Sequence, residues 1–124
     1  MLRRIALACA IAAGLAATAA QAHHSYAMFD RSKTVTLNGV VKQFQWTNPH
    51  SWIQLTVPGD AGATDEWSIE MGSPFELLRV GWTTTTVKVG EKVSIQIHPV
   101  KDGTKGGGFV SGTDADGHAL GGGK

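Results

Sequence analysis

Histidine side chains are the residues of this 124-residue sequence best suited to chemistry, and two of the five, His23 and His24, are adjacent. If processing makes His23 the first residue, its α-amine and ring Nδ1 can close a chelate on one metal ion. Reference pKa values of about 7.7–8.0 for the amine and about 6.5 for the ring let both lose a proton near neutral pH. Nitrogen ligands favour Cu(II), with Ni(II) and Zn(II) behind it. We therefore predict a copper site at His23 and His24, acting together or as alternatives.

A third ligand would turn this chelate into a defined site. His50 is the first candidate because it follows the turn residues Asn48-Pro49, and His98 is the second. Met28 or Met71 could supply a soft sulfur ligand to Cu(I). Each residue also has a structural interpretation. The histidine pair could simply be exposed and polar, His50 could hold its turn by hydrogen bonds to the backbone, His98 could end a strand, and Met71 has the parity of a core residue.

Tryptophans near the same turn suggest a second kind of site. Trp46 and Trp52 flank Asn48-Pro49, and Trp52 has the opposite parity to Ile53 on its strand. Together they could border a groove for a small ligand or an envelope protein, as on the binding faces of OB barrels. The alternative, which we favour, is that the segment Tyr26-Ala27-Met28-Phe29 folds over both rings and buries them.

The first 22 residues have the pattern of a cleavable signal peptide. Two arginines, Arg3 and Arg4, precede an apolar run of small residues over 5–20, and Ala20-Gln21-Ala22 provides a small-x-small cleavage site. The apolar run is shorter than the ~20 residues that span a bilayer. The sequence therefore predicts a periplasmic or secreted protein with no membrane attachment after processing. The arginine pair leaves open whether general secretion or twin-arginine export is used.

Residues 23–120 have the size of one domain, and residues 121–124 are predicted to be a frayed tail. Cys9, the only cysteine, lies in the segment that is removed. The mature chain would therefore contain no disulfide, thiolate metal site or cysteine nucleophile. Without Arg3 and Arg4, nine basic side chains face ten acidic ones, a formal net charge of −1. No basic run is present, so a nucleic-acid partner is not expected.

Arrangements typical of enzymes are weak in this sequence. Glu66 and Glu70 share the parity of a strand face that is expected to be solvated. The run Lys105-Gly106-Gly107-Gly108 lacks the Lys-Ser/Thr pair and the following helix of a phosphate loop. We therefore expect a non-enzymatic binding or accessory protein. Its oligomeric state is not predicted.

Alternating apolar residues predict a strand-rich domain. Residues 34–57 indicate two strands with a bulge near Gly39, and Pro58-Gly59-Asp60-Ala61-Gly62 is the turn of a hairpin to a third strand around Trp67 and Met71. A fourth strand is expected over 93–97. A flexible glycine-rich loop is expected over 101–108, followed by a last strand over 109–113.

A short helix is the clearest local signal in the chain. Ser73 can cap it, Pro74 suits the first helical position, and Glu76 completes a capping box. Gly81 is a natural stop. Four residues are expected to form its buried apolar stripe: Phe75, Leu77, Leu78 and Val80.

The element order is three strands, a helix and two strands. This order predicts a mainly β fold, a small OB-like five-stranded barrel with one short helix between strands 3 and 4. A small open sandwich is the competing architecture.

The motifs now assembled resemble a known bacterial family. They are His23-His24-Ser25-Tyr26-Ala27-Met28-Phe29-Asp30, Val35-Thr36-Leu37-Asn38-Gly39-Val40-Val41, Phe44-Gln45-Trp46-Thr47-Asn48-Pro49-His50, Trp67-Ser68-Ile69-Glu70-Met71-Gly72-Ser73-Pro74, Ile97-His98-Pro99, Lys101-Asp102-Gly103 and Asp116-Gly117. They are similar to the family catalogued as domain of unknown function 6152. The resemblance implies a small exported protein without an assigned activity, and it carries over no catalytic residues.

Overall fold

The structure is a computed structural model that describes residues 26–121. Its elements are β1 (Val35–Gln45), β2 (Trp52–Pro58), the 3-10 turn η1 (Asp60–Gly62), β3 (Thr64–Glu70), α2 (Pro74–Arg79), β4 (Lys92–Pro99) and β5 (Gly106–Asp114). The predicted signal peptide, His23 and His24 lie outside the described residues, as do residues 122–124 of the predicted tail.

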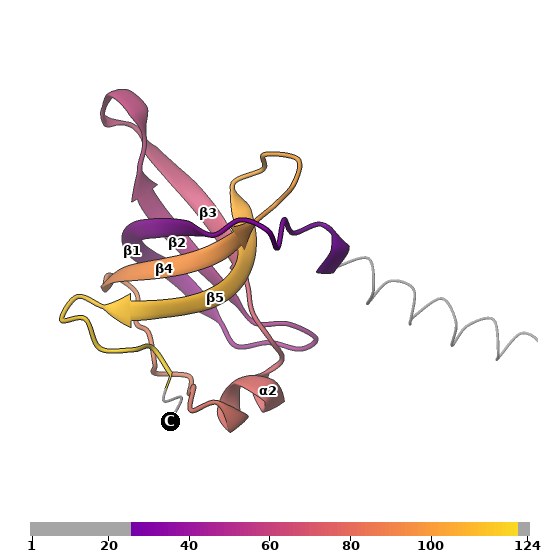
Figure 1. Cartoon of the computed structure of the whole chain (residues 1–124). Helices are drawn as coiled ribbons and strands as arrows, with labels where there is room; N and C mark the ends of the chain where they lie inside the picture. The colour runs from indigo at the N-terminus through magenta and orange to yellow at the C-terminus, as the bar shows by residue number, and fades with distance from the viewer. Residues whose placement is uncertain (1–25, 122–124) are drawn as a thin grey trace, which may run out of the picture.

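The five strands close into a barrel in the order β1-β2-β3-β5-β4. Strand β1 pairs antiparallel with both β2 and β4, whereas β3 and β5 close the barrel in parallel. Helix α2 lies at the lower end of the barrel in Figure 1, and the β2–β3 turn projects at the opposite end. The predicted OB-like barrel with one short helix between strands 3 and 4 is confirmed. Among the described residues, no helix has the length and apolar character needed to cross a membrane.

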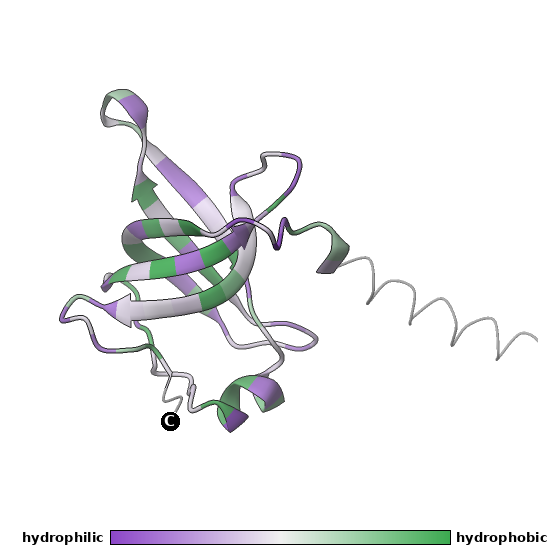
Figure 2. Cartoon of the chain, in the orientation of Figure 1, coloured by the Kyte–Doolittle hydropathy of each residue, from purple (hydrophilic) through white to green (hydrophobic). Residues whose placement is uncertain are grey.

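Alternation along the strands fills the barrel. Figure 2 shows apolar and polar residues in turn along the strands. The side chains that point inward are nearly free of solvent: Leu37, Val41, Ile53, Leu55, Ile69, Val93, Ile95 and Ile97. Burial of each contributes about 1.5–3 kcal/mol relative to exposure, so this cluster is the main source of stability.

The amino-terminal segment, residues 26–33, is fastened to the outside of the barrel. Phe29 forms a β-bridge with Val100, and the peptide N–H groups of Asp30 and Lys101 donate to the carbonyls of Pro99 (2.8 Å) and Met28 (2.9 Å). The Phe29 side chain is buried. These contacts fix the point from which the chain runs back toward the predicted mature start.

Strand β5 differs from the sequence expectation. Residues 106–108, predicted to end a loose loop, are paired strand residues. A Cβ at Gly107 would lie 2.5 Å from the carbonyl oxygen of His98, and one at Gly108 would lie 3.2 Å from the Phe29 ring. The glycines therefore permit close packing, which their composition alone does not distinguish from flexibility.

The bulge of β1 is also displaced from its predicted position. The register shifts between Val41 and Gln43 rather than at Gly39. Gly39 has another role, because a Cβ there would lie 2.6 Å from the carbonyl oxygen of Thr56. It allows the coiled strand to approach its neighbour.

Helix α2 has the predicted ends. Ser73 accepts a hydrogen bond from the Glu76 N–H, the Glu76 side chain accepts one from the Ser73 N–H, and Pro74 is the first residue. Gly81 follows with a φ of 81°. The predicted buried stripe is wrong, however. Only Leu77 is buried, and the other three members are exposed: Phe75 (69%), Leu78 (58%) and Val80 (52%). A six-residue helix across one end of a barrel turns only one side inward.

We predict that Gly107→Ala lowers the free energy of unfolding by about 1–3 kcal/mol, because the added carbon must displace a backbone carbonyl. Urea denaturation of the mature protein measures this change. Val110→Ala on the same strand, where the side chain is exposed, is the matched control and should change stability by about 0.5 kcal/mol or less. Equal effects of the two substitutions would show that residues 106–108 are not tightly packed.

The capping box should make stability depend on pH. Hydrogen bonds from the Ser73 backbone and side chain hold the pKa of Glu76 below its usual value of 4.5, with a smaller effect from the charge of His50. A lowered folded-state pKa contributes stability above the unfolded value, and this contribution is lost as pH falls through the folded value. We therefore expect Glu76→Gln to reduce the loss of stability between pH 7 and pH 3, as measured by thermal unfolding. An unchanged loss would contradict the assignment.

Candidate metal site beside the amino-terminal segment

The loop between β1 and β2, residues 46–51, places His50 at the mouth of the barrel. Ser51 is fully buried, and its backbone is paired on both sides, with its N–H donating to Gly72 and its carbonyl accepting from Met71, each at 2.9 Å. Thr47 Oγ1 donates to the carbonyl of His50 at 2.9 Å, and the Asn48–Pro49 peptide bond is cis. The turn is thus held by Thr47 and Ser51, which leaves the His50 ring available for another contact.

That contact is with a buried carboxylate. His50 Nδ1 lies 2.5 Å from Glu70 Oε1, with side-chain exposures of 23% for the histidine and 8% for the glutamate. A carboxylate oxygen accepts, so Nδ1 carries a proton, and Nε2 is the ring nitrogen that remains for another contact. Metal-binding histidines typically have this arrangement, in which a carboxylate fixes the tautomer and orientation of the ring.

Glu70 is the residue of this candidate site that sequence reasoning missed. Its parity predicted a solvated side chain, and that expectation holds for Glu66, which is exposed, but is wrong for Glu70, which is 7% exposed. Glu70 pairs in register with Gly108, against which Phe29 packs. The outer face of the sheet is covered at this position by the amino-terminal segment. Three consecutive glycines on a strand were the available sign that something packs there.

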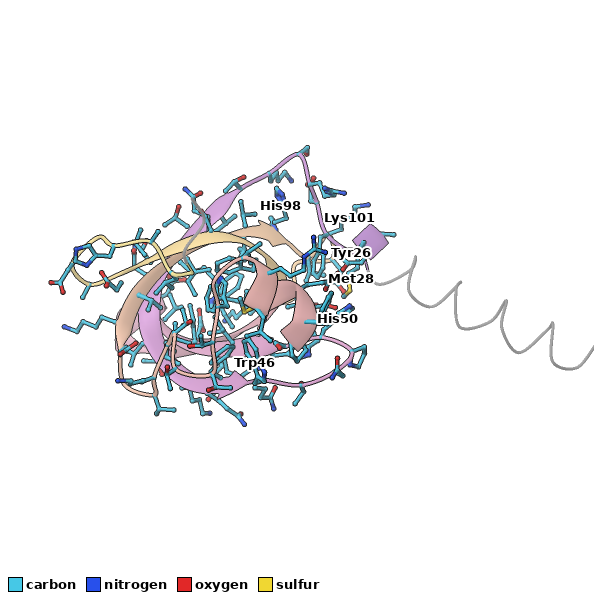
Figure 3. All side chains as sticks on the ribbon, turned by 90° about the horizontal axis from the view of Figure 1, so that it is seen from below. Tyr26, Met28, Trp46, His50, His98 and Lys101 are labelled. Atoms are coloured by element: carbon cyan, nitrogen blue, oxygen red, sulfur yellow. The ribbon has the colours of Figure 1, made fainter. Side chains whose placement is uncertain are left out.

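The amino-terminal segment meets His50 through Tyr26. The rings of Tyr26 and His50 are in edge contact, with centroids 6.0 Å apart and planes at 63°. Figure 3 shows Tyr26, Met28 and His50 on the same side of the barrel, with Trp46 apart from them. Three residues of extended chain span at most about 11 Å, so residue 23 has a short reach from Tyr26. His23 and His24 themselves lie outside the described residues.

The other candidate ligands differ in accessibility. His98 Nδ1 lies 2.8 Å from the carbonyl oxygen of Lys33, so this ring fastens the amino-terminal segment at the end of β4. Met71 is buried at 5% exposure and belongs to the core, as its parity indicated. Met28 is 45% exposed. Of the two sulfur candidates, only Met28 is open to a ligand from outside.

Acidic side chains surround His50 and favour a cation. Glu70 contacts its ring directly. Glu76, at the start of α2, is close enough for the charge of His50 to contribute to the lowering of its pKa, after the larger effect of the Ser73 hydrogen bonds. A positive ion on His50 would therefore experience two carboxylates.

Trp46 and Trp52 are both partly buried. Trp46 packs against the core and stands edge-on to Phe44, with ring centroids 5.8 Å apart. Neither tryptophan lines the three hollows described on the surface of residues 26–121. The segment expected to cover them crosses β5 at Gly108 instead. The ligand groove at Trp46 and Trp52 stays a prediction.

A second group of metal-type side chains lies at the end of β5 and in the turn after it: Asp114, Asp116 and His118, with ligand atoms within 4.8 Å of one another. The Asp114 carboxylate accepts hydrogen bonds from the N–H groups of His118 and Asp116. Both hydrogen bonds lower the pKa of Asp114, and the bond from His118 has the larger effect. These hydrogen bonds close the turn, and this closure explains why the three side chains lie together.

The structure thus defines a class of protein, a small OB-like barrel with a histidine–carboxylate pair beside a fastened amino-terminal segment. The chain belongs to the family of unknown function DUF6152, whose model matches residues 11–109. No curated protein matches it. Among solved structures, it is similar to the mitochondrial single-stranded DNA binding protein Rim1 of S. cerevisiae, with 14% identity over 73% of this chain and 96% of that chain and a TM-score of 0.51. At this identity the likeness shows the fold alone.

We expect His50→Ala to lower the free energy of unfolding by about 1–3 kcal/mol, because it removes a hydrogen-bond partner of a buried carboxylate. Chemical denaturation at pH 7 without added metal measures the effect. His118→Ala, which removes an exposed histidine beside an aspartate, is the control and should cost about 0.5 kcal/mol or less. If the two variants lose the same stability, the His50–Glu70 pair is not a structural contact.

Proposed function

We propose that the protein is exported and processed and then binds one copper ion through His23, His24 and His50. The position of His50 is the observation that carries this proposal. Its ring is fixed by a buried glutamate and contacts Tyr26, three positions after His23. A rigid imidazole and a short tether with an amino-terminal histidine are the parts that a copper site needs.

Each ligand would have a defined part in the site. The α-amine and Nδ1 of His23 would form the chelate, and Nε2 of His50 would add a third nitrogen from the rigid barrel. His24 would serve as a further ligand or as an alternative to His23. Glu70 would not touch the metal in this arrangement. It would act as a positioning residue that holds the His50 ring and raises its basicity. Cu(II) is the ion that such a nitrogen set binds best.

The proposed role is capture or buffering of copper outside the cytoplasm. The signal pattern of residues 1–22 supports export, and the amine would become available only when peptidase frees His23. In the precursor that nitrogen belongs to a peptide bond and cannot act as an amine ligand. The precursor should therefore lack the site, which would confine copper binding to the compartment where the mature protein resides.

Copper titration against a competing chelator tests the proposal. The mature protein should bind one Cu(II), and a glycine placed ahead of His23 should reduce the affinity by well over tenfold because it displaces the amine. Glu70→Gln should weaken binding by about 10–100-fold, the usual effect of losing a carboxylate behind a histidine ligand. His118→Ala, a histidine far along the chain, should bind as the unaltered protein does.

Intact mass of the protein isolated from its own export compartment fixes the true mature start. A start other than residue 23, or equal affinity with and without the added glycine, would refute the amine chelate. Unchanged affinity in His50→Ala would refute the participation of the barrel and leave only a flexible peptide ligand.

A further inference from the structure

A cavity of about 250 Å³ lies between the amino-terminal segment and the end of the barrel; Tyr26 and Glu70 line it, whereas His50 does not. Its apolar wall is formed by Phe29, Met71, Leu77 and Phe109. The first three are buried at 8%, 5% and 6% exposure, and Met71 and Leu77 belong to the hydrophobic core. Part of the wall is therefore formed by core side chains.

Arg31 and His98 are the basic residues that line the cavity. The Arg31 side chain is also exposed to solvent. The peptide N–H of Asp30 donates to the carbonyl of Pro99 at 2.8 Å, and the carbonyl of Lys33 accepts from His98 Nδ1 at 2.8 Å, so residues 30–33 wrap around the His98 ring. Within residues 26–121, Arg31 has no ion-pair partner, whereas the neighbouring Lys33 pairs with Asp30 at 3.2 Å.

The acidic residue of the cavity is at the opposite side. Glu70 and His98 pair with the same residue, Gly108, from its two sides. They are therefore separated by two inter-strand spacings, about 10 Å. The Glu70 carboxylate contacts His50, and Phe29 packs over Gly108 between the two strands. A negative group placed at Arg31 would thus be kept away from Glu70.

We propose that this cavity binds a small organic carboxylate, with the carboxylate at Arg31 and its apolar body against Phe29, Leu77 and Phe109. Guanidinium groups pair with carboxylates through two parallel hydrogen bonds, which suits a planar anion. The volume corresponds to about eight water molecules of ~30 Å³ each, so the ligand has roughly ten non-hydrogen atoms at most. The cavity shares Tyr26 and Glu70 with the surroundings of His50, but His50 does not line it, and the proposal does not depend on metal.

Benzoate and benzamide are suitable probes because they share one shape and differ in charge. Calorimetry on the mature protein, freed of metal by a chelator, should show saturable benzoate binding at millimolar or lower concentration. Benzamide should bind at least about tenfold more weakly, as expected when a charge-assisted hydrogen bond is replaced by a neutral one. Shifts in the amide NMR spectrum should centre on residues 29–31, 77, 98 and 109.

Arg31→Gln should weaken benzoate binding by about tenfold or more and leave benzamide binding unchanged. Arg79→Gln is the matched control, since Arg79 lies on α2, where its guanidinium stands 5.9 Å from the Phe75 ring, and it does not line the cavity. Absence of saturable benzoate binding, equal binding of the two probes, or an Arg31 variant that binds like the unaltered protein would each overturn the proposal. None of these outcomes bears on copper affinity, which is measured without either probe.

Discussion

The burial of one carboxylate is the constraint on which the rest of the site depends. Removing an ionised glutamate from water costs several kcal/mol, and the cost is recovered only when its oxygens have well-placed partners. Glu70 contacts the His50 ring, and this contact holds only if the β1–β2 loop is rigid. Thr47 and the buried Ser51 supply that rigidity. The loop that carries the histidine is therefore tied to the sheet by hydrogen bonds.

Closure of the barrel is the reason why Glu70 is buried. Strands β3 and β5 meet in parallel over only three residue pairs, Ser68 with Gly106, Ile69 with Gly107 and Glu70 with Gly108. Side chains on β5 at these positions would collide with the neighbouring strand or with Phe29. Glycines thus let the barrel close and let the amino-terminal segment cover the end of β3. The same residues shelter Glu70 and anchor the segment that leads back to the predicted mature start.

Sequence patterns predicted the barrel well because its strands have one face in the core. Alternation located Ile53, Leu55 and Ile69, and the capping box located α2. The pattern failed for Glu70, because alternation separates the two faces of a sheet without showing what covers the outer one. It failed for the outer residues of α2 for a related reason. The sequence shows that these residues are apolar, but it does not show which side of the helix packs against the end of the barrel.

The candidate site was predicted only in part. His50 was recognised by its place beside the Asn48-Pro49 turn, and the structure adds its partner. Glu70 is buried and the cavity at Arg31 is formed because the amino-terminal segment crosses β5. This crossing is a contact between residues nearly 80 positions apart along the chain. No local pattern encodes such a contact. The composition of residues 101–108 instead predicted a flexible loop at the glycines that make this contact.

The anchored segment also explains how a weak ligand pair could become a strong site. A free amino-terminal histidine offers two nitrogens on a mobile chain. Here the chain is fastened to the barrel at Met28, Phe29 and Asp30. Only a few residues therefore link this fastened segment, which lies beside the His50 ring, to the proposed chelate. Short tethers give effective concentrations in the millimolar range, and they cost little entropy because little chain is left to order. In the proposed copper site, binding of the third nitrogen would then be an intramolecular step. The barrel in this view contributes position more than chemistry: it holds one imidazole still and sets the length of chain that separates it from the others.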